Sequence, residues 1–556
     1  MYSPESVEKR TPLWAHLRGY LSSHAGVGVI FLVFLAIGAA DYNPRTSHLQ
    51  ARDYEAHSGD EPHYIVIINS LLYDGDLYLE DDYQSALHGG WEAGRSHRGR
   101  RIHHHTIVID PATAHTQLWR EAYDPHKPLP CDTLDCTPYR RRNGTGFDAA
   151  AKLRETPAHP PAFAALLAAL IWPLAASPHE VELLAGWVLT LVALAAILVT
   201  YLAALASGMK PRSALAASAL LALASPWLAY SKGYFSETTI GLALVAAIYF
   251  IAKKRALPAA IAISCAMILK PPFVLLGVAW LFDRLLARDW RTARTACLVM
   301  GLAGFTLVGF NAQVLGRVIV AGSRGWVGAA PTEDGAAAGN LGWIFSTTGW
   351  IGTVVANGYR NLLDDRHGLL IFVPWVAISA IIGVRTVLLR RGRSSVDQVI
   401  ATGSASYLLL LSSFAGGLAG VCFGPRHWVA FLPLLALLAA RAIEVHGAWI
   451  RWTLAALAVV SVAFSLPAGL AYRQIWHRHP WTALARMLPQ AGPPVGAILY
   501  SESTWAAFKD TQGHGWVPAD GRRVPSSSLY YLLFGLSHVP RIPLDGTGDK
   551  SYIRIN

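Results

Sequence analysis

The run ELLAGWVLTLVALAAILVTYLAALA, residues 182–206, carries one charged side chain, Glu182 at its first position. About 20 consecutive apolar residues in a helix suffice to cross the hydrocarbon core of a bilayer. A surface helix of a water-soluble protein would instead show a polar stripe along one side, and the apolar stretch of a buried core helix is usually shorter. This stretch therefore predicts a transmembrane helix and sets the fold class for the rest of the chain.

The composition of the whole chain agrees with that class. Hydrophobic residues make up 53% of the 556 residues, charged residues only 15%, and the mean hydropathy is +0.33. Soluble domains carry about 25% charged residues, so a water-soluble globule is excluded, and so is a disordered chain. The net charge is +11, but its basic residues are scattered among apolar runs rather than clustered. We therefore expect membrane lipids as partners and no nucleic acid.

Similar apolar runs recur along the chain and predict an all-α polytopic membrane protein of about eleven transmembrane helices. They cover residues 25–41, 182–206, 213–230, 236–252, 256–269, 272–283, 296–315, 367–389, 396–415, 427–443 and 450–470. The transmembrane domain is thus expected within 1–470. The fifth and sixth runs are short and flank Lys270, so they form either a tight pair or a partly re-entrant segment.

The orientation follows from the basic residues at the ends of these runs, because cytoplasmic loops are enriched in Lys and Arg. With the N-terminus cytoplasmic, the basic groups after the second, fourth, sixth and eighth runs all face the cytoplasm. Eleven crossings then place the C-terminal region 471–556 outside. The apolar stretch 158–175 would disturb this pattern as a further crossing. Since it opens with His159-Pro160-Pro161 and contains Pro173, we expect a helix that lies in the outer interface.

The first extracytoplasmic loop, residues 41–157, is too long for a simple connection and holds half of the chain's 36 acidic residues. Its aromatic residues and apolar periodicity predict packed structure, with a strand over 102–109. Cys131 and Cys136 in this loop favour a local disulfide in an oxidising compartment. A zinc site is the alternative, because His103, His104, His105, His115 and His126 lie nearby, although their spacing fits no tight zinc motif.

The sharpest local pattern in the loop is Gly59-Asp60-Glu61-Pro62-His63-Tyr64. Asp60 is a favourable N-cap and Pro62 suits a first helical turn. Apolar residues then recur at helical spacing as far as Leu72, which predicts an amphipathic helix against the outer leaflet. Asp60 has two interpretations: it caps this helix, or it is a general base held at the membrane surface.

The position of this motif, shortly after the first predicted span, resembles the acidic motif of GT-C glycosyltransferases. That superfamily includes the protein O-mannosyltransferases and the lipid A aminoarabinose transferases. Four further elements resemble theirs and follow in the same order. They are His159-Pro160-Pro161, Ser236-Glu237-Thr238, the stretch from Asp365 to Leu370, and Phe423-Gly424-Pro425-Arg426.

The resemblance implies a GT-C-like bundle in a bacterial cytoplasmic (inner) membrane. The enzyme would transfer a sugar from a polyprenyl-phosphate donor to a glycan, lipid or protein acceptor on the outer face. Asp60 would be the base and Glu61 would orient it or the acceptor. The donor phosphate would be bound by Arg426, Lys270 and Arg366, with Arg324 and Arg360 as weaker candidates. The remaining substrate contacts are expected from His63, Tyr64, His159 and Glu237.

Members of this superfamily differ in their use of divalent cations, and we expect no resident metal or other cofactor here. The acidic residues Asp74, Asp76, Asp81 and Asp82 form either a calcium site or a solvated turn. Two other functions stay open. One is an oligosaccharyl or pilin-type transferase that acts on protein. The other is a secondary transporter, although the hydropathy pattern shows no internal repeat.

Overall fold

We describe the fold from a computed structural model of the chain. It describes residues 13–43, 48–52, 54–56, 60–99, 106–109, 116–118, 154–157, 159–314, 350–364, 367–388, 395–413, 423–446 and 448–470, together with 515–516 and 524–525. The predicted disulfide residues Cys131 and Cys136, the predicted phosphate ligand Arg366, the weaker candidate Arg324 and nearly all of 471–556 lie outside these ranges.

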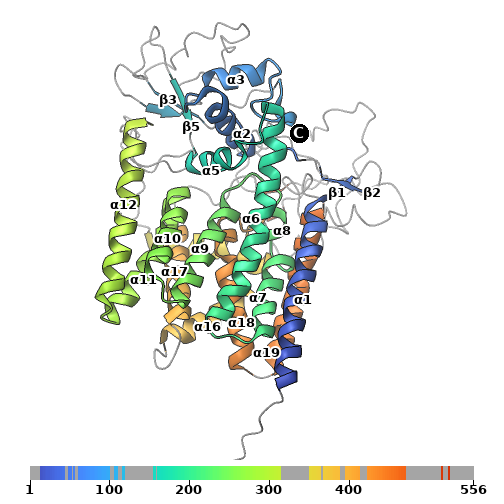
Figure 1. Ribbon diagram of the computed structural model, residues 1–556, viewed down its shortest axis with the longest axis vertical. Helices are drawn as coiled ribbons and strands as arrows, with labels where there is room; N and C mark the ends of the chain where they lie inside the picture. Colours follow the sequence, from blue (N-terminus) through green and yellow to red (C-terminus); the bar gives the residue numbers. More distant parts are fainter. Residues whose placement is uncertain are drawn as a thin grey trace, which may run out of the picture.

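Most of the described residues belong to a bundle of roughly aligned helices (Figure 1). The bundle comprises α1 (Leu13–Gly38), α6 (Pro178–Ala206), α7 (Pro211–Leu223), α8 (Trp227–Tyr230), α9 (Glu237–Ala252), α10 (Ala256–Leu269), α11 (Val274–Leu286), α12 (Trp290–Val314), α15 (Leu369–Phe372), α16 (Val376–Leu388), α17 (Ser395–Ser412), α18 (Leu432–Val445) and α19 (Ala448–Leu470). Short 3-10 helices, η4 (Pro271–Phe273) and η5 (Arg426–Phe431), lead into α11 and α18.

Helical structure occupies every predicted membrane run, but the number of crossings stays a prediction. Four described helices are long and apolar enough to cross a membrane: Pro178–Ala206, Trp290–Ala312, Arg426–Val445 and Ala448–Leu470. The mostly helical architecture and these four helices agree with the predicted all-α membrane protein. The predicted runs 213–230 and 367–389 are each interrupted, because Pro226 and Pro374 lack the N–H that a continuous helix needs. The first run also ends early, since residues 40–43 form a strand.

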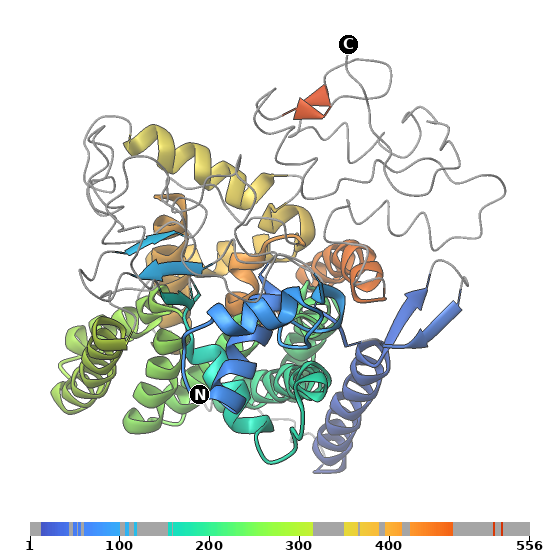
Figure 2. The same cartoon turned by 90° about the horizontal axis from the view of Figure 1, so that it is seen from above.

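A smaller layer, here called the cap, covers one end of the bundle (top of Figure 1, and in front in Figure 2). It contains α2 (Glu61–Asn69), the π-helix η1 (Ser70–Asp74), α3 (Glu80–Leu87), the 3-10 helix η2 (Arg95–His97) and α5 (Ala162–Ile171). An antiparallel sheet of order β4-β3-β5 joins β3 (Thr106–Ile109), β4 (Thr116–Leu118) and β5 (Arg154–Pro157), with Ile107 opposite Leu118 and Thr156. β1 (Ala40–Asn43) and β2 (His48–Ala51) form a hairpin beside α1, and β6 (Gly515–Trp516) pairs with β7 (Val524–Pro525).

Glu182 holds the cap onto the bundle. Its carboxylate, at the start of α6, accepts hydrogen bonds from the backbone N–H groups of Ala56 (2.5 Å) and Arg95 (2.9 Å). Each of these donors would otherwise have to be satisfied elsewhere in a buried layer. The single carboxylate therefore joins two cap segments to a long bundle helix.

The predicted amphipathic helix at the start of the cap does not lie on a surface. All nine residues of α2 are buried, Glu61 and His63 included. α5 packs against α2 and α6 and covers the face that was expected to meet lipid. The ten residues of α5 rise only about 15 Å, half of what a crossing needs. Its place in the membrane interface stays a prediction.

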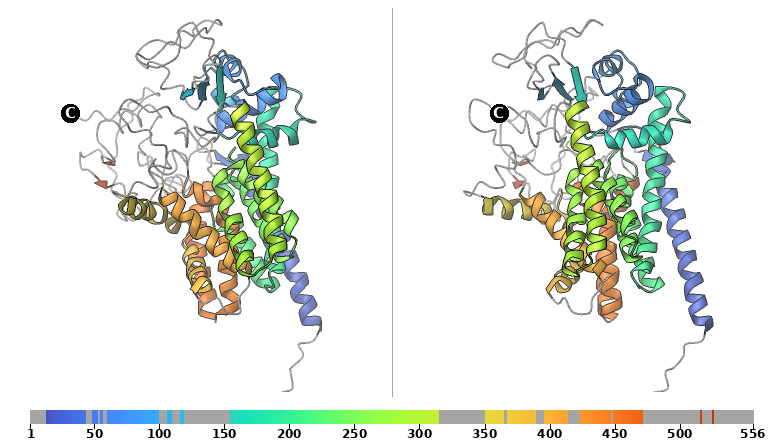
Figure 3. Two further views of the ribbon diagram at one scale, coloured as in Figure 1. Left: turned by 90° about the vertical axis from the view of Figure 1, so that its left-hand side faces the viewer. Right: turned by 60° about the vertical axis from the view of Figure 1, so that its left-hand side comes forward.

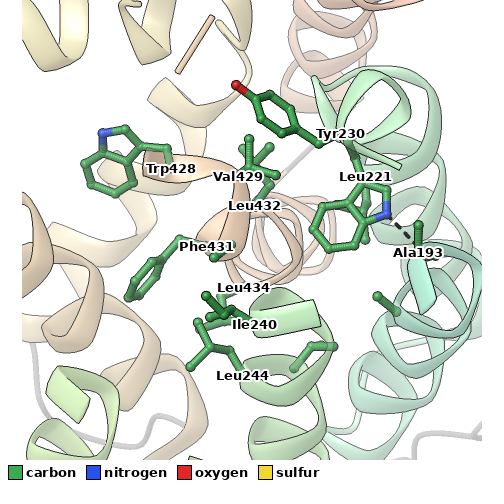
Figure 4. Close-up of a cluster of buried hydrophobic side chains, with 14 of the residues drawn as sticks. Ala193, Leu221, Tyr230, Ile240, Leu244, Trp428, Val429, Phe431, Leu432 and Leu434 are labelled. Atoms are coloured by element: carbon green, nitrogen blue, oxygen red, sulfur yellow. Dashed lines mark hydrogen bonds between the residues drawn. The ribbon is translucent and has the colours of Figure 1, made fainter. Parts of the chain in front are cut away.

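The bundle core is a continuous set of buried apolar side chains, part of which is shown in Figure 4. The indole of Trp227 donates a hydrogen bond to the carbonyl of Ala193 (3.2 Å; dashed line). A Cβ on Gly241 would stand 2.7 Å from the same indole ring, so only glycine permits this approach of α9. Close packing of this kind holds helices together where water is absent, and it fixes where the start of α9 lies.

The sequence did not indicate a helix in α14 (Trp350–Leu363). It lies across the bundle axis beside α17, as the two directions of view in Figures 2 and 3 agree. Its outward side carries Ile351, Val355 and Tyr359, which are at least half exposed, while Asn357 is buried and donates to the carbonyl of Ser412 (3.2 Å). Arg360, a weaker phosphate candidate, is exposed on this helix.

Candidate functional site

Five of the predicted site residues come together where the cap meets the bundle. We call Asp60, His159, Glu237, Lys270 and Arg426 the charged cluster. Asp60 and His159 precede α2 and α5 of the cap, and Glu237 begins α9. Lys270 lies between α10 and η4, and Arg426 begins η5. Direct contacts join all five, although up to 366 residues separate the members of a pair.

Asp60 occupies the N-cap position of α2, but it does not cap the helix. Its backbone is helical (φ −91°, ψ −29°) and its side chain makes no capping hydrogen bond. Instead, Oδ2 accepts a hydrogen bond from Nη1 of Arg426. The interpretation of Asp60 as a cap is therefore wrong, because its side chain pairs with a distant arginine and makes no capping hydrogen bond to the helix.

Arg426 connects two carboxylates through different edges of its guanidinium. Nη1 donates to Asp60, and Nε donates to Oε1 of Glu237 at 3.1 Å. The guanidinium carbon lies 4.2 Å from the centre of the Phe235 ring, a cation–π contact. The chain reaches this position through Gly424, whose φ of +56° is in the left-handed region that favours glycine.

Glu237 gathers the two cations of the cluster around one oxygen. Its Oε1 accepts hydrogen bonds from Lys270 Nζ at 2.7 Å and from Arg426 Nε at 3.1 Å. The Glu237 side chain is only 1% exposed, so an unpaired charge there would be costly. The sequence predicted a substrate contact at this position, whereas the carboxylate is directed to the protein's own cations.

The exposed fractions separate the cluster into an accessible and a closed part. The side chains of Lys270 (23%), Asp60 (19%) and Arg426 (10%) are partly exposed, while Glu237 is not. An incoming ligand can therefore reach the two cations and Asp60. Glu237 supports them from behind.

The cap supplies aromatic and imidazole groups on the other side of Asp60. Nε2 of His159 lies 4.0 Å from Oδ1 of Asp60. The His159 ring packs against Tyr64 at a centroid distance of 5.2 Å. Nδ1 of His63 is 2.6 Å from the hydroxyl of Tyr83. Burial raises the pKa of the Tyr64 phenol well above its usual value, so that phenol stays protonated and neutral.

Two predicted site residues are turned into the protein. Glu61 is fully buried and accepts a hydrogen bond from the backbone N–H of Tyr234 at 2.9 Å, in the segment before α9. His63 is 1% exposed. Glu61 joins α2 to the bundle, and His63 contacts Tyr83 of α3 within the cap. Substrate contacts by either residue stay predictions.

Aromatic rings pack along the segments that carry the two cations. Tyr407 stacks on Phe273 and Phe431 with centroid distances of 5.1 and 4.6 Å, and Trp428 packs edge-on against Tyr407 at 5.6 Å. All four rings are buried. Apolar surroundings lower the local dielectric constant and strengthen the interactions of nearby charges.

A second buried group of charges, which we call the anchor cluster, was not predicted from the sequence. It consists of Asp41, Arg52 and Lys232. Lys232 Nζ lies 3.0 Å from Asp41 Oδ1 and also donates to the carbonyl of Ala40. Arg52 donates to Thr190 Oγ1 (3.1 Å) and to the carbonyl of Lys232. Charges in linkers between apolar runs look solvated in a sequence, and only the folded chain reveals their pairing.

Metal ligands are a separate question. Within the described part of the chain, no three His, Cys, Asp or Glu side chains are grouped closely enough to hold a metal ion. In the acidic turn, burial and the neighbouring Asp74 and Asp81 raise the pKa of Asp82 to about 9. The expectation that the chain holds no resident metal stays a prediction.

Comparisons with known proteins give no further guide. No protein-family model, no curated protein and no solved structure matches the chain.

The arrangement itself combines three chemical capacities at one place. Arg426 and Lys270 can bind an anion through charge-assisted hydrogen bonds. Asp60 can accept a proton from a group in contact with it. The aromatic and helical surroundings provide apolar surface beside these polar groups. A ligand suited to the cations and the apolar surface has an anionic group, such as a phosphate, and an apolar part. A second reactant with a hydroxyl group would suit Asp60.

Proposed function

We propose that the chain is a membrane glycosyltransferase of the GT-C type. It would move a sugar from a polyprenyl-phosphate donor to an acceptor on the extracytoplasmic face of a bacterial cytoplasmic membrane. The observation that carries this proposal is the convergence of Asp60, His159, Glu237, Lys270 and Arg426 at one end of an apolar bundle. These residues come from separate segments of the sequence, and several of those segments resemble GT-C motifs.

The reaction would be a single displacement at the anomeric carbon. The acceptor hydroxyl oxygen forms a bond to that carbon while its proton passes to a carboxylate oxygen of Asp60. The bond from the anomeric carbon to the phosphate oxygen breaks, and its electron pair leaves with the polyprenyl phosphate. Lys270 and Arg426 stabilise the negative charge that accumulates on the leaving phosphate.

The position of the cluster suits this chemistry. A lipid-linked donor keeps its isoprenoid chain in hydrocarbon and its phosphate at the membrane surface. Cations at a helix-bundle end match that division better than cations in mid-bundle, which would indicate an ion pathway. We orient the cap end outward because the basic residues between the predicted spans favour a cytoplasmic position for the opposite end.

The decisive experiment is a transfer assay with the purified protein in nanodiscs and a panel of polyprenyl-phosphate sugars. Turnover with one donor, lost in Asp60→Asn, would support the proposal. Mass spectrometry of co-purified lipid provides an independent readout, with bound polyprenyl phosphate expected. Absence of turnover with every donor, together with substrate uptake into proteoliposomes, would favour the secondary transporter. Transfer only to protein acceptors would favour the oligosaccharyl or pilin-type enzyme.

A further inference from the structure

Arg426 is positioned so that it can exchange one of its two partners and keep the other. Nε is bonded to Glu237, which is 1% exposed, and Nη1 is bonded to Asp60, which is 19% exposed. Phe235 covers one face of the guanidinium at 4.2 Å. The Nε edge is therefore fixed inside the protein, while the Nη edge ends at the accessible side of the cluster.

The charges of the cluster are balanced before any ligand binds. Two carboxylates, Asp60 and Glu237, face two cations, Lys270 and Arg426. A phosphate that enters this group meets two cations that each already donate to a carboxylate. Of the two carboxylates, Asp60 is the accessible one and shares only an Nη atom with Arg426. Competition is consequently expected at the Asp60–Arg426 link.

We propose that the donor phosphate and Asp60 compete for the Nη edge of Arg426, so that donor binding releases Asp60 to act as the base. This inference rests on the proposed function and adds an order of events to it. The phosphate binds first and takes over Nη1, while Nε stays on Glu237. Asp60 then has an oxygen available for the acceptor hydroxyl.

Release also changes the chemistry of Asp60. A carboxylate bonded to a guanidinium is stabilised as the anion and accepts a proton poorly. When the guanidinium moves to the phosphate, that stabilisation is lost and the carboxylate becomes a stronger proton acceptor. His159, with Nε2 4.0 Å from the other carboxylate oxygen, is placed to hold Asp60 in position. The base is thus weak in the resting protein and stronger once a donor is present.

The test measures binding of a polyprenyl monophosphate, the proposed reaction product, to the full chain in nanodiscs. Asp60→Asn removes the competitor for Arg426, and we expect affinity to increase about tenfold, the scale of one charge-assisted hydrogen bond. Glu55→Gln is the matched control, because it also removes a carboxylate that is paired with an arginine, Arg95 at 3.5 Å, outside the charged cluster. That variant is expected to bind within about twofold of the unmodified protein.

A double-mutant cycle distinguishes competition from simple charge repulsion. In an Arg426→Gln background no guanidinium can be released, so Asp60→Asn is expected to give no gain in affinity. If the gain persists in that background, or if Asp60→Asn does not tighten binding at all, the coupling is wrong. Should Asp60→Asn fail to fold, Asp60→Ala replaces it in both backgrounds. Failure of the unmodified protein to bind any polyprenyl phosphate would instead overturn the proposed function, and the coupling with it.

Discussion

The two buried groups of charges at the cap end of the bundle have similar members but different surroundings. In the anchor cluster, the side chains of Lys232 and Asp41 are 0% and 4% exposed. Its two cations donate to backbone carbonyls as well as to side chains. In the charged cluster, Asp60 and Lys270 are 19% and 23% exposed. The contacts that join them to the cluster are made with other charged side chains.

This difference indicates two roles for buried ion pairs in one molecule. A cation that also satisfies backbone carbonyls cannot leave without exposing an unpaired buried group, so the anchor cluster fixes the β1–β2 hairpin and the α8–α9 connection in place. A cation that donates to a partly exposed carboxylate, as Arg426 does to Asp60, can exchange that carboxylate for a ligand. We therefore expect changes in the charged cluster to affect activity and changes in the anchor cluster to affect stability.

The largest expected effect is that of Asp60→Asn on transfer. Loss of the general base should reduce kcat about 10³-fold, within the usual range for such groups, while the apparent melting temperature is unchanged. The measurement is initial transfer rate alongside a thermal unfolding curve in the same nanodiscs. Retained turnover would refute the role of Asp60. A large fall in melting temperature would mean that the two clusters do not differ as described.

The next largest effect is expected from Lys232→Met, on stability rather than rate. The substitution leaves Asp41 buried without its cation, which should lower the free energy of unfolding by about 3 kcal/mol. The double variant Asp41→Asn/Lys232→Met should recover part of that loss. Denaturant unfolding in detergent measures both, and the folded fraction should keep its transfer rate. Unchanged stability in the single variant would remove the anchor role.

A smaller effect is expected when the cations of the charged cluster are exchanged. Arg426→Lys keeps the charge but provides one donor atom where two edges are needed, and we expect about a tenfold fall in kcat/KM. Lys270→Arg keeps both the charge and a donor toward Glu237 and serves as the control, with a milder loss. Equal losses in the two variants would show that charge alone matters at Arg426.

The last prediction is a pH dependence of stability that belongs to the anchor cluster. Burial lowers the pKa of Lys232 from 10.5 to about 8, so between those values the unfolded chain binds more protons than the folded one. Stability should therefore rise as the pH increases from about 8 to about 10.5. Melting curves of the unmodified protein and of Lys232→Met across this window should diverge by a few degrees. Parallel curves would exclude Lys232 as the titrating group.

Much of the charged cluster could be predicted from the sequence, because its members stand in short motifs at the ends of apolar runs. Asp60, His159, Glu237 and Arg426 are predicted through the resemblance of those motifs to GT-C glycosyltransferases, and Lys270 is predicted from its place in the turn between two apolar runs. Their partners could not be predicted in this way. Glu61, one residue from Asp60, accepts a hydrogen bond from the backbone N–H of Tyr234, whereas Asp60 pairs with Arg426. Which partner each carboxylate meets depends on the segments packed against the start of α2.

Two interrupted helices and the unpredicted helix α14 also show what the sequence could not predict. Apolar composition predicted single helices over 213–230 and 367–389, although the prolines at 226 and 374 divide both. In α14, Ile351, Val355 and Tyr359 recur at helical spacing, but the helix was not predicted. Only the fold shows that its asparagines face the protein and these apolar residues face outward.

The sequence by itself determined that this is a helical membrane protein, since hydropathy is a local property that each segment carries without its neighbours. It also indicated which polar residues stand at the ends of the apolar runs. Only the tertiary structure decided which charges pair, because Asp60 and Arg426 are 366 residues apart and meet through the packing of α2, α9 and η5. The exposure of each pair, and with it the division between anchor and candidate site, depends on that packing alone.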